Sequence, residues 1–197
     1  MKSIKIAFAI LAFAFISISC SKSDNQTPTV YPEENFWQGF INNAGYSNPT
    51  PINTGNNMGY GLQFKPKVKG KINSFVVKLP QTGSVWITLK KGDLYTTSIY
   101  EENFNVTTSN TDFLKVITPI ELEKDTKYYL IVVSTNYFEY NRTSSNQAVI
   151  SGNIEIDGTS YASNGDSGSG LSNFSNSFND IWNEMYGNVS FNFQRTE

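Results

Sequence analysis

The side chains of this sequence allow little catalytic chemistry. The 197 residues include no histidine and a single cysteine, Cys20. Without histidine, the Ser-His-Asp and Cys-His nucleophilic devices, histidine-ligated zinc and the commonest general base near neutral pH are all excluded for this chain. A pair of carboxylates remains as a catalytic route, because most glycosidases work with two acidic residues.

Four acidic residues stand near aromatic residues and are the candidates for such a pair. They are Glu139, Asp166, Asp180 and Glu184. No two of them have a diagnostic spacing, and acidic side chains on a protein rich in strands are mostly solvated charges. We therefore predict that the protein is not an enzyme.

The segment IDGTSYASNGDSGSG combines carboxylate and amide oxygens with glycine. In it Asp157, Asn164 and Asp166 could supply oxygen ligands to Ca²⁺. Their spacing does not match the Asp-x-Asx-x-Asx-Gly pattern of a calcium loop, so an ordinary flexible loop is predicted instead. We expect neither a metal ion nor another cofactor.

Aromatic side chains are better candidates for binding than the acids are for catalysis. In the segment SVWITLKK, the alternation places Val85, Ile87 and Leu89 on one face, which is predicted to be the core face. Trp86 then points to the opposite face, where a solvent-facing indole offers a flat apolar platform for a sugar ring. The alternative is that both faces are covered.

Two further segments, STNYFEYNRTSSN and NDIWNEMYG, mix aromatic residues with asparagine and serine. We predict the first to be a loop at the end of a rigid sandwich, where binding residues collect. Tyrosine with asparagine and serine is also the composition of adaptable binding surfaces. The alternative is a hairpin whose aromatic residues cover a sheet edge. The candidate ligand-binding residues in these segments are Tyr137, Phe138, Tyr140, Arg142, Trp182 and Tyr186.

The elements that must position these residues are predicted to be β-strands. Residues 71–80, 84–91 and 188–195 alternate apolar and polar side chains, and the unbroken apolar run 128–133 indicates a central strand. About eight to ten short strands, separated by turn residues, predict an all-β fold, an antiparallel β-sandwich or jelly roll.

Other segments lack a clear strand pattern. Residues 36–58 show no helical period and are predicted to form a short strand and a long loop. We expect a turn at Asp157-Gly158 and at most one helical turn, near residues 179–185.

The first 19 residues differ in composition from the rest. Two lysines precede an uncharged apolar run from Ile6 to Ile18, which is typical of a secretory signal. The run is shorter than the roughly 20 residues that a membrane-spanning helix needs. Ser19-Cys20 at its end resembles the lipobox of bacterial lipoproteins, in which the cysteine is lipidated and becomes the new N-terminus.

This resemblance implies a signal peptide over residues 1–19, a lipid anchor at Cys20 and a flexible tether over residues 20–35. A single β-sandwich domain is then expected over residues 36–197. The alternative is a cleaved signal whose cysteine is incidental. The Ser-Lys-Ser-Asp sequence after Cys20 resembles the tags of surface-exposed lipoproteins, which implies outward display from the outer membrane of a bacterial cell envelope.

A second resemblance covers roughly residues 59–193. The sequences GLQFKP, GKI, SVWITL, TKYYL and VSFNF are similar to motifs of uncharacterised β-sandwich modules in secreted bacterial proteins, some of which are appended to glycoside hydrolases. The resemblance implies a β-sandwich, and it associates the chain with glycans.

Charge excludes one class of partner. Of 15 basic residues two lie in the signal segment, against 17 acidic residues, so the remaining domain is mildly acidic and is not expected to bind nucleic acid. We therefore expect a lipid-anchored envelope module that binds a glycan through exposed aromatic residues. The alternatives are a structural lipoprotein that docks onto an envelope protein complex and a carboxylate-based glycosidase.

Overall fold

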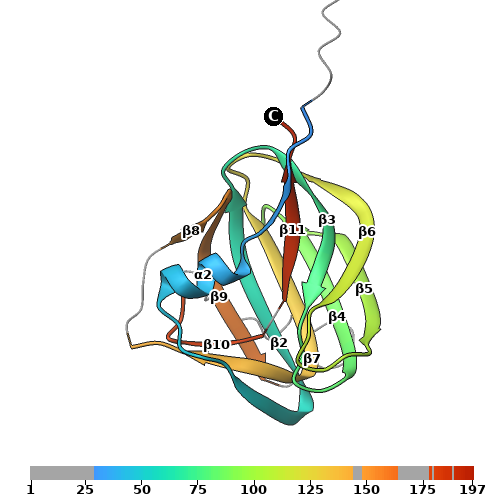
Figure 1. Cartoon of the computed structure of the whole chain (residues 1–197), viewed down its shortest axis with the longest axis vertical. Coiled ribbons are helices and arrows are strands. Elements are labelled where there is room, and N and C mark those ends of the chain that lie inside the picture. The colour runs from blue at the N-terminus through green and yellow to red at the C-terminus, as the bar shows by residue number, and fades with distance from the viewer. Residues whose placement is uncertain (1–28, 144–147, 164–177, 179, 188) are drawn as a thin grey trace, which may run out of the picture. The chain divides into compact units, whose positions relative to one another are not determined.

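Two antiparallel sheets pack face to face, as the alternating pattern predicts (Figure 1). The smaller sheet has the strand order β1-β11-β3-β6. The larger has the order β5-β4-β7-β2-β9-β8, and β10 pairs with the end of β7. The strands are β1 (Glu33–Asn35), β2 (Thr50–Pro66), β3 (Gly70–Val77), β4 (Gly83–Lys91), β5 (Ser98–Val106), β6 (Phe113–Leu122), β7 (Tyr128–Asn141), β8 (Val149–Ser151), β9 (Ile154–Ser163), β10 (Glu184–Tyr186) and β11 (Val189–Arg195). The predicted all-β sandwich is confirmed.

The computed structural model describes residues 29–143, 148–163, 178, 180–187 and 189–197. Every element above belongs to one compact unit, Tyr31–Glu197. The predicted signal peptide and Cys20 lie outside the described residues. Within the described part, no helix is long and apolar enough to cross a lipid bilayer.

Large aromatic side chains fill the space between the sheets. Phe64 and Phe191, from opposite sheets, have ring centroids 4.9 Å apart, and Phe36 lies 4.7 Å from Phe191 on the other side. Val85 and Ile87 are fully buried, as the alternation in β4 predicts. Each such side chain contributes about 1.5–3 kcal/mol through burial, so this core is the main source of stability.

A helix, α2 (Trp37–Ala44), forms where a short strand and a long loop were predicted, and that prediction is wrong. Phe40 and Ala44 are buried on one face, and Gly45 ends the helix with φ 74°. The helix joins the β1 side of the smaller sheet to β8 of the larger, because Ser151 Oγ donates to Phe36 O at 2.7 Å. A Cβ on Gly39 would lie 2.2 Å from that same Oγ, so only glycine permits this approach.

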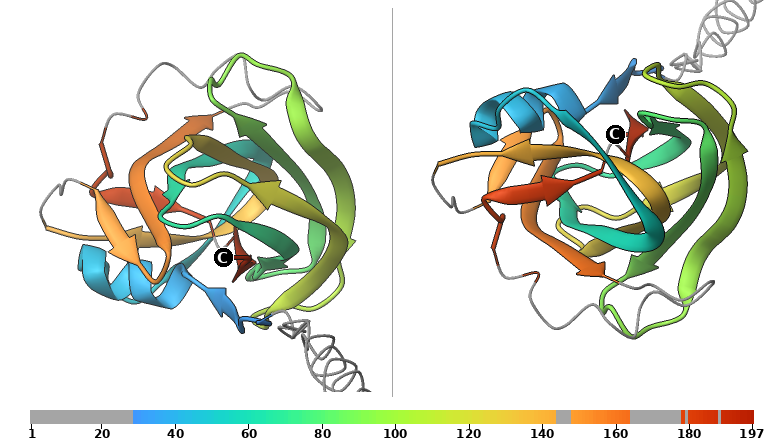
Figure 2. Two further views of the ribbon diagram at one scale, coloured as in Figure 1. Left: turned by 90° about the horizontal axis from the view of Figure 1, so that it is seen from above. Right: turned by 90° about the horizontal axis from the view of Figure 1, so that it is seen from below.

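The opposite side of the sandwich is closed by β5 and β6 (Figure 2). Lys115 on β6 donates a hydrogen bond to Glu102 on β5. Next to this pair, Phe104 and Phe113 stack with their ring centroids 5.9 Å apart. The two sheets are therefore tied together at both sides, by the helix at one and by these pairs at the other.

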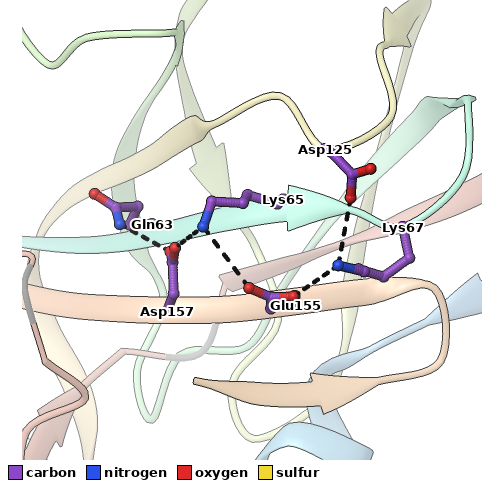
Figure 3. A network of polar contacts seen from close by, with 6 residues as sticks. All are labelled: Gln63, Lys65, Lys67, Asp125, Glu155 and Asp157. Carbon is purple, nitrogen blue, oxygen red and sulfur yellow. Dashed lines mark hydrogen bonds and ion pairs between the residues drawn. The ribbon is translucent and has the colours of Figure 1, made fainter. Parts of the chain in front are cut away.

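The predicted turn at Asp157-Gly158 is wrong, because β9 continues through both residues. A register shift opposite Gln63 accommodates the additional residue as a bulge. Gln63 Nε2 donates to Asp157 Oδ1 at 2.8 Å, and Lys65 Nζ lies 2.5 Å from Asp157 Oδ2 (Figure 3). The carboxylate is therefore satisfied by side chains of the neighbouring strand.

The same network extends along the sheet to the turn between β6 and β7. Lys67 Nζ lies 2.9 Å from Glu155 Oε2 and 3.3 Å from Asp125 Oδ1 (Figure 3). Asn164 and Asp166, the other two residues considered as calcium ligands, lie outside the described residues. Among the described residues, no group of three or more acids or cysteines is placed to hold a metal ion.

Candidate binding site

Four predicted ligand-binding residues lie in the interior of the fold. Tyr137, Phe138, Tyr140 and Arg142 are all buried. The predicted loop is wrong over residues 134–141, which continue β7 and pair with β2 and β10. Tyr137 OH accepts a hydrogen bond from Ser134 N–H and donates one to Ser134 O. The hydroxyl of Tyr137 is therefore already hydrogen-bonded inside the protein.

Arg142 forms hydrogen bonds to two separate chain segments, the end of α2 and the segment that precedes Trp182. Its Nη1 donates to Ala44 O, at the end of α2, at 3.1 Å, and its Nη2 donates to Ile181 O. The guanidinium also lies 5.0 Å from the ring centroid of Tyr46. Burial lowers the pKa of Arg142. Arg142 therefore positions α2 and the segment before Trp182 instead of meeting a ligand.

Trp86 is half-buried on the outer face of the larger sheet. It is paired with Val133, and its Nε1 donates to Thr88 Oγ1 at 3.2 Å. Thr88 and Lys90, which share this face, are both buried. A second apolar cluster lies on the same sheet and contains Leu94, Tyr129, Ile131, Ala162 and Phe178. The face is therefore partly covered, and Trp86 is not an open platform.

Trp182 is instead exposed, at the edge of a hollow of about 400 Å³. We call it the Trp182 hollow; it is lined by Tyr161, Asp180, Ile181, Trp182, Asn183 and Glu184. The exposed fractions are 44% for Trp182 and 42% for Tyr161. The sequence analysis named Trp182 and missed Tyr161, although Tyr161 lies in a strand where alternation gives the side-chain direction.

Hydrogen bonds fix the main chain of Trp182 on both sides. Its N–H donates to Thr159 Oγ1 at 3.0 Å, and its carbonyl accepts from Tyr46 OH at 2.6 Å. Burial raises the pKa of Tyr46 to about 12, so this donor keeps its proton at neutral pH. The main-chain position of Trp182 is therefore set by the protein before any ligand arrives.

The other aromatic wall of the hollow is also supported. Tyr161 meets Tyr186 edge to face, with ring centroids 5.2 Å apart and an angle of 71° between the rings. Tyr186 OH donates to Glu184, which orients that carboxylate at the hollow. Tyr186, a predicted ligand-binding residue, thus supports two lining residues. Where at most one helical turn was predicted, Glu184–Tyr186 instead forms β10 and pairs with β7.

A second hollow, of about 520 Å³, lies beside α2. We call it the α2 cleft. Its lining includes Trp37, Gln38 and Asn42 of α2, Tyr46 and Tyr140, and Lys78 and Asp112. Trp37 is half-buried and meets Tyr140 edge to face with ring centroids 5.9 Å apart. The sequence analysis did not name Trp37; its signal was the spacing of Phe36, Trp37, Phe40 and Ile41, which fits a helical period.

The four candidate catalytic acids are only partly brought together. Asp180 and Glu184 line the Trp182 hollow, whereas Glu139 on β7 accepts a hydrogen bond from Asn141 Nδ2 at 2.6 Å. Asp166 lies outside the described residues. The arrangement provides stacking surfaces with hydrogen-bonding groups beside them. No model of a known protein family matches the chain, and no curated protein matches it.

Proposed function

We propose that this protein is a lipid-anchored module of the bacterial cell envelope, displayed from the outer membrane, that binds glycans at the Trp182 hollow without catalysis. The observation that carries the proposal is the pair of exposed aromatic rings, Trp182 and Tyr161, at one hollow. The apolar face of a sugar stacks on such rings, and carboxylate and amide groups bind its hydroxyls.

The size and rigidity of the hollow support this proposal. Its volume of about 400 Å³ lies within the roughly 300–1,000 Å³ of small-ligand sites. Trp182 is held through its main chain and Tyr161 through the ring of Tyr186. Since little main-chain freedom is then lost on binding at Trp182, a larger part of the stacking free energy appears as affinity.

The N-terminal sequence supports the proposed location in the cell envelope. An apolar segment of signal length ends at Ser19-Cys20, and a polar segment follows. Diacylation of a cysteine buries enough methylene groups for a durable anchor, at about 0.8 kcal/mol each. Replacing Cys20 by serine should move the protein from the detergent phase to the aqueous phase when cell extracts are partitioned with detergent.

The binding proposal is tested with the purified full chain on a glycan array. We expect Trp182→Ala to weaken every positive signal at least about tenfold, since a stacked aromatic ring contributes more than about 1.4 kcal/mol. Tyr95→Ala removes another exposed aromatic ring, one that does not line the hollow, and should leave the signals unchanged. A folded wild-type protein that binds no glycan would refute the proposal.

The absence of catalysis is tested on the glycans that bind. Asp180 and Glu184 are the only candidate catalytic acids that the described structure places at this hollow. We expect bound glycans to be recovered intact after long incubation. Release of shorter sugars by the wild type, and its loss in Glu184→Gln, would identify a glycosidase instead.

A second candidate function, docking to an envelope protein, is favoured by a different surface. β6 is an edge strand, and its Leu114 and Val116 are 54% and 70% exposed. An edge with apolar side chains is a ready site for another protein. If docking is the function, Val116→Lys abolishes a specific crosslinked complex in cells, whereas Trp182→Ala preserves it.

A further inference from the structure

Hydrogen-bonding groups stand unused along the α2 cleft. Gln38 Nε2 donates to Asn42 Oδ1 at 2.9 Å, and both side chains are exposed. Within the described part of the chain, no hydrogen bond uses Gln38 Oε1 or Asn42 Nδ2. One acceptor and one donor group therefore stand next to each other on the helix. This pairing suits the vicinal hydroxyls of a sugar, each of which both donates and accepts.

Two opposite charges line the same cleft. Lys78 is half-buried, and its Nζ lies 5.9 Å from the ring centroid of Phe138. Asp112 is exposed. Among the described residues, neither Lys78 nor Asp112 forms an ion pair within 4 Å. Both are available for hydrogen bonds to a ligand, and their charges cancel.

The α2 cleft and the Trp182 hollow share one wall. Tyr46 lines the cleft, and its hydroxyl donates to the carbonyl of Trp182 at 2.6 Å. Tyr140 also lines the cleft, and it pairs with Met185, which directly follows Glu184 of the hollow. A single tyrosine side chain therefore separates the cleft from the main chain of Trp182.

We propose that the α2 cleft is a second sugar subsite and that one neutral oligosaccharide contacts both the cleft and the Trp182 hollow. This inference rests on the proposed function. Trp37 provides the aromatic surface of the second subsite, and Gln38 and Asn42 bind hydroxyls there. Asp180 and Glu184 make the hollow acidic, and the cleft adds no net charge, so uronic acid polymers are repelled.

The experiment compares chain lengths by calorimetric titration of the full chain. The ligands are gluco-, manno-, xylo- and chito-oligosaccharides from disaccharide to hexasaccharide, with oligogalacturonates and alginate oligomers as the anionic set. The cleft variant is Gln38→Ala combined with Asn42→Ala, which removes exposed amides and raises helix propensity. Its matched control is Asn43→Ala on the same helix, because the Asn43 side chain instead donates to Ile150 O at 2.9 Å.

We expect the cleft variant to weaken binding of the longest neutral ligand about tenfold, as the loss of two neutral hydrogen bonds implies, and to leave disaccharide binding unchanged. Asn43→Ala should change neither, and Trp182→Ala should weaken both. An unchanged cleft variant with an impaired Trp182→Ala variant would overturn this inference and leave the proposed function standing.

Three further results would overturn the bridging ligand, the charge argument or the proposed function itself. If the cleft variant loses the same affinity for short and for long ligands, one oligosaccharide does not contact both the α2 cleft and the Trp182 hollow. Anionic ligands that bind as tightly as neutral ones would overturn the charge argument. If the wild type binds none of these ligands and no glycan on the array, the proposed function and this inference fall together.

Discussion

Replacing Arg142 by methionine tests whether one buried cation holds the two hollows in place. Methionine keeps most of the apolar stem and removes the guanidinium. The carbonyls of Ala44 and Ile181 then lose their donors, at a cost of about 1–3 kcal/mol each. Loss of the contact with the Tyr46 ring adds about 1 kcal/mol. Relief from burying a charge offsets part of this, so we expect unfolding to become easier by about 3 kcal/mol.

Urea unfolding followed by tryptophan fluorescence measures this change. For a domain of this size each 1 kcal/mol lowers the melting temperature by about 2–4 °C, so Arg142→Met should melt about 10 °C lower than the wild type. Arg142→Lys keeps the charge but lacks the planar fork that reaches two carbonyls, and it should fall between the two. Lys124→Met, an exposed control, should change little.

The same variant makes a functional prediction. Ile181 directly precedes Trp182, and α2 ends at Ala44, so both hollows lose a restraint when Arg142 is absent. Glycan affinity should therefore fall even at temperatures where Arg142→Met is fully folded. A change in unfolding free energy below about 1 kcal/mol, together with unchanged affinity, would refute the role given to Arg142.

Three other predictions concern the fold. Burial raises the Tyr46 pKa from 10.0 to about 12, so its contribution to stability is complete below pH 10 and is lost as the pH rises through about 12. The unfolding free energy should fall by about 2.7 kcal/mol in total across this titration, and by less in Tyr46→Phe. Gly70→Ala places a Cβ 2.2 Å from Phe193 Cζ and should cost about 2 kcal/mol in urea unfolding. Hydrogen bonds from Lys115 and then Tyr100 lower the Glu102 pKa, so Glu102→Gln should reduce the urea midpoint at pH 7 and not at pH 3.

Each of these has a control or a contradicting result. Unfolding free energy that stays constant from pH 10 to 12 would contradict the burial of Tyr46. Gly83→Ala is matched to Gly70→Ala, because its Cβ meets only the side-chain nitrogen of Asn136, at 3.1 Å, and it should cost less than Gly70→Ala. For Glu102→Gln, an equal loss of stability at pH 3 and pH 7 would show that the carboxylate charge is not involved.

The sheets could be predicted because their pattern is local. In β4 and β11 apolar side chains recur at every second position of the sequence, and period two assigns each of them to the core face without knowledge of the rest of the fold. The end of β7 gave no such signal. Tyr137 and Phe138 are neighbours in sequence and both are buried, because the strand is covered on both faces there. Because aromatic and polar residues follow one another here without alternation, the sequence predicts a loop although the segment is a strand with both faces covered.

Helix α2 was missed for a related reason. Its apolar residues follow a helical spacing over only eight positions, and Gly39, Asn42 and Asn43 interrupt it with poor helix formers. Such a helix is too short to be stable alone. It forms because Phe40 and Ala44 pack into the side of the sandwich and because Ser151 binds the carbonyl of Phe36.

The tryptophans show why a binding site is harder to predict than a fold. The direction of Trp86 followed correctly from its inward-facing neighbours, yet the face to which it points is partly covered by residues distant in sequence. Trp182 is exposed although Ile181, directly before it, is fully buried. Direction depends on a residue's own strand, but exposure depends on what the rest of the chain places above it. A stacking surface therefore has to be found in the folded molecule, and the rigid main chain of Trp182 is what distinguishes it there from an incidental exposed ring.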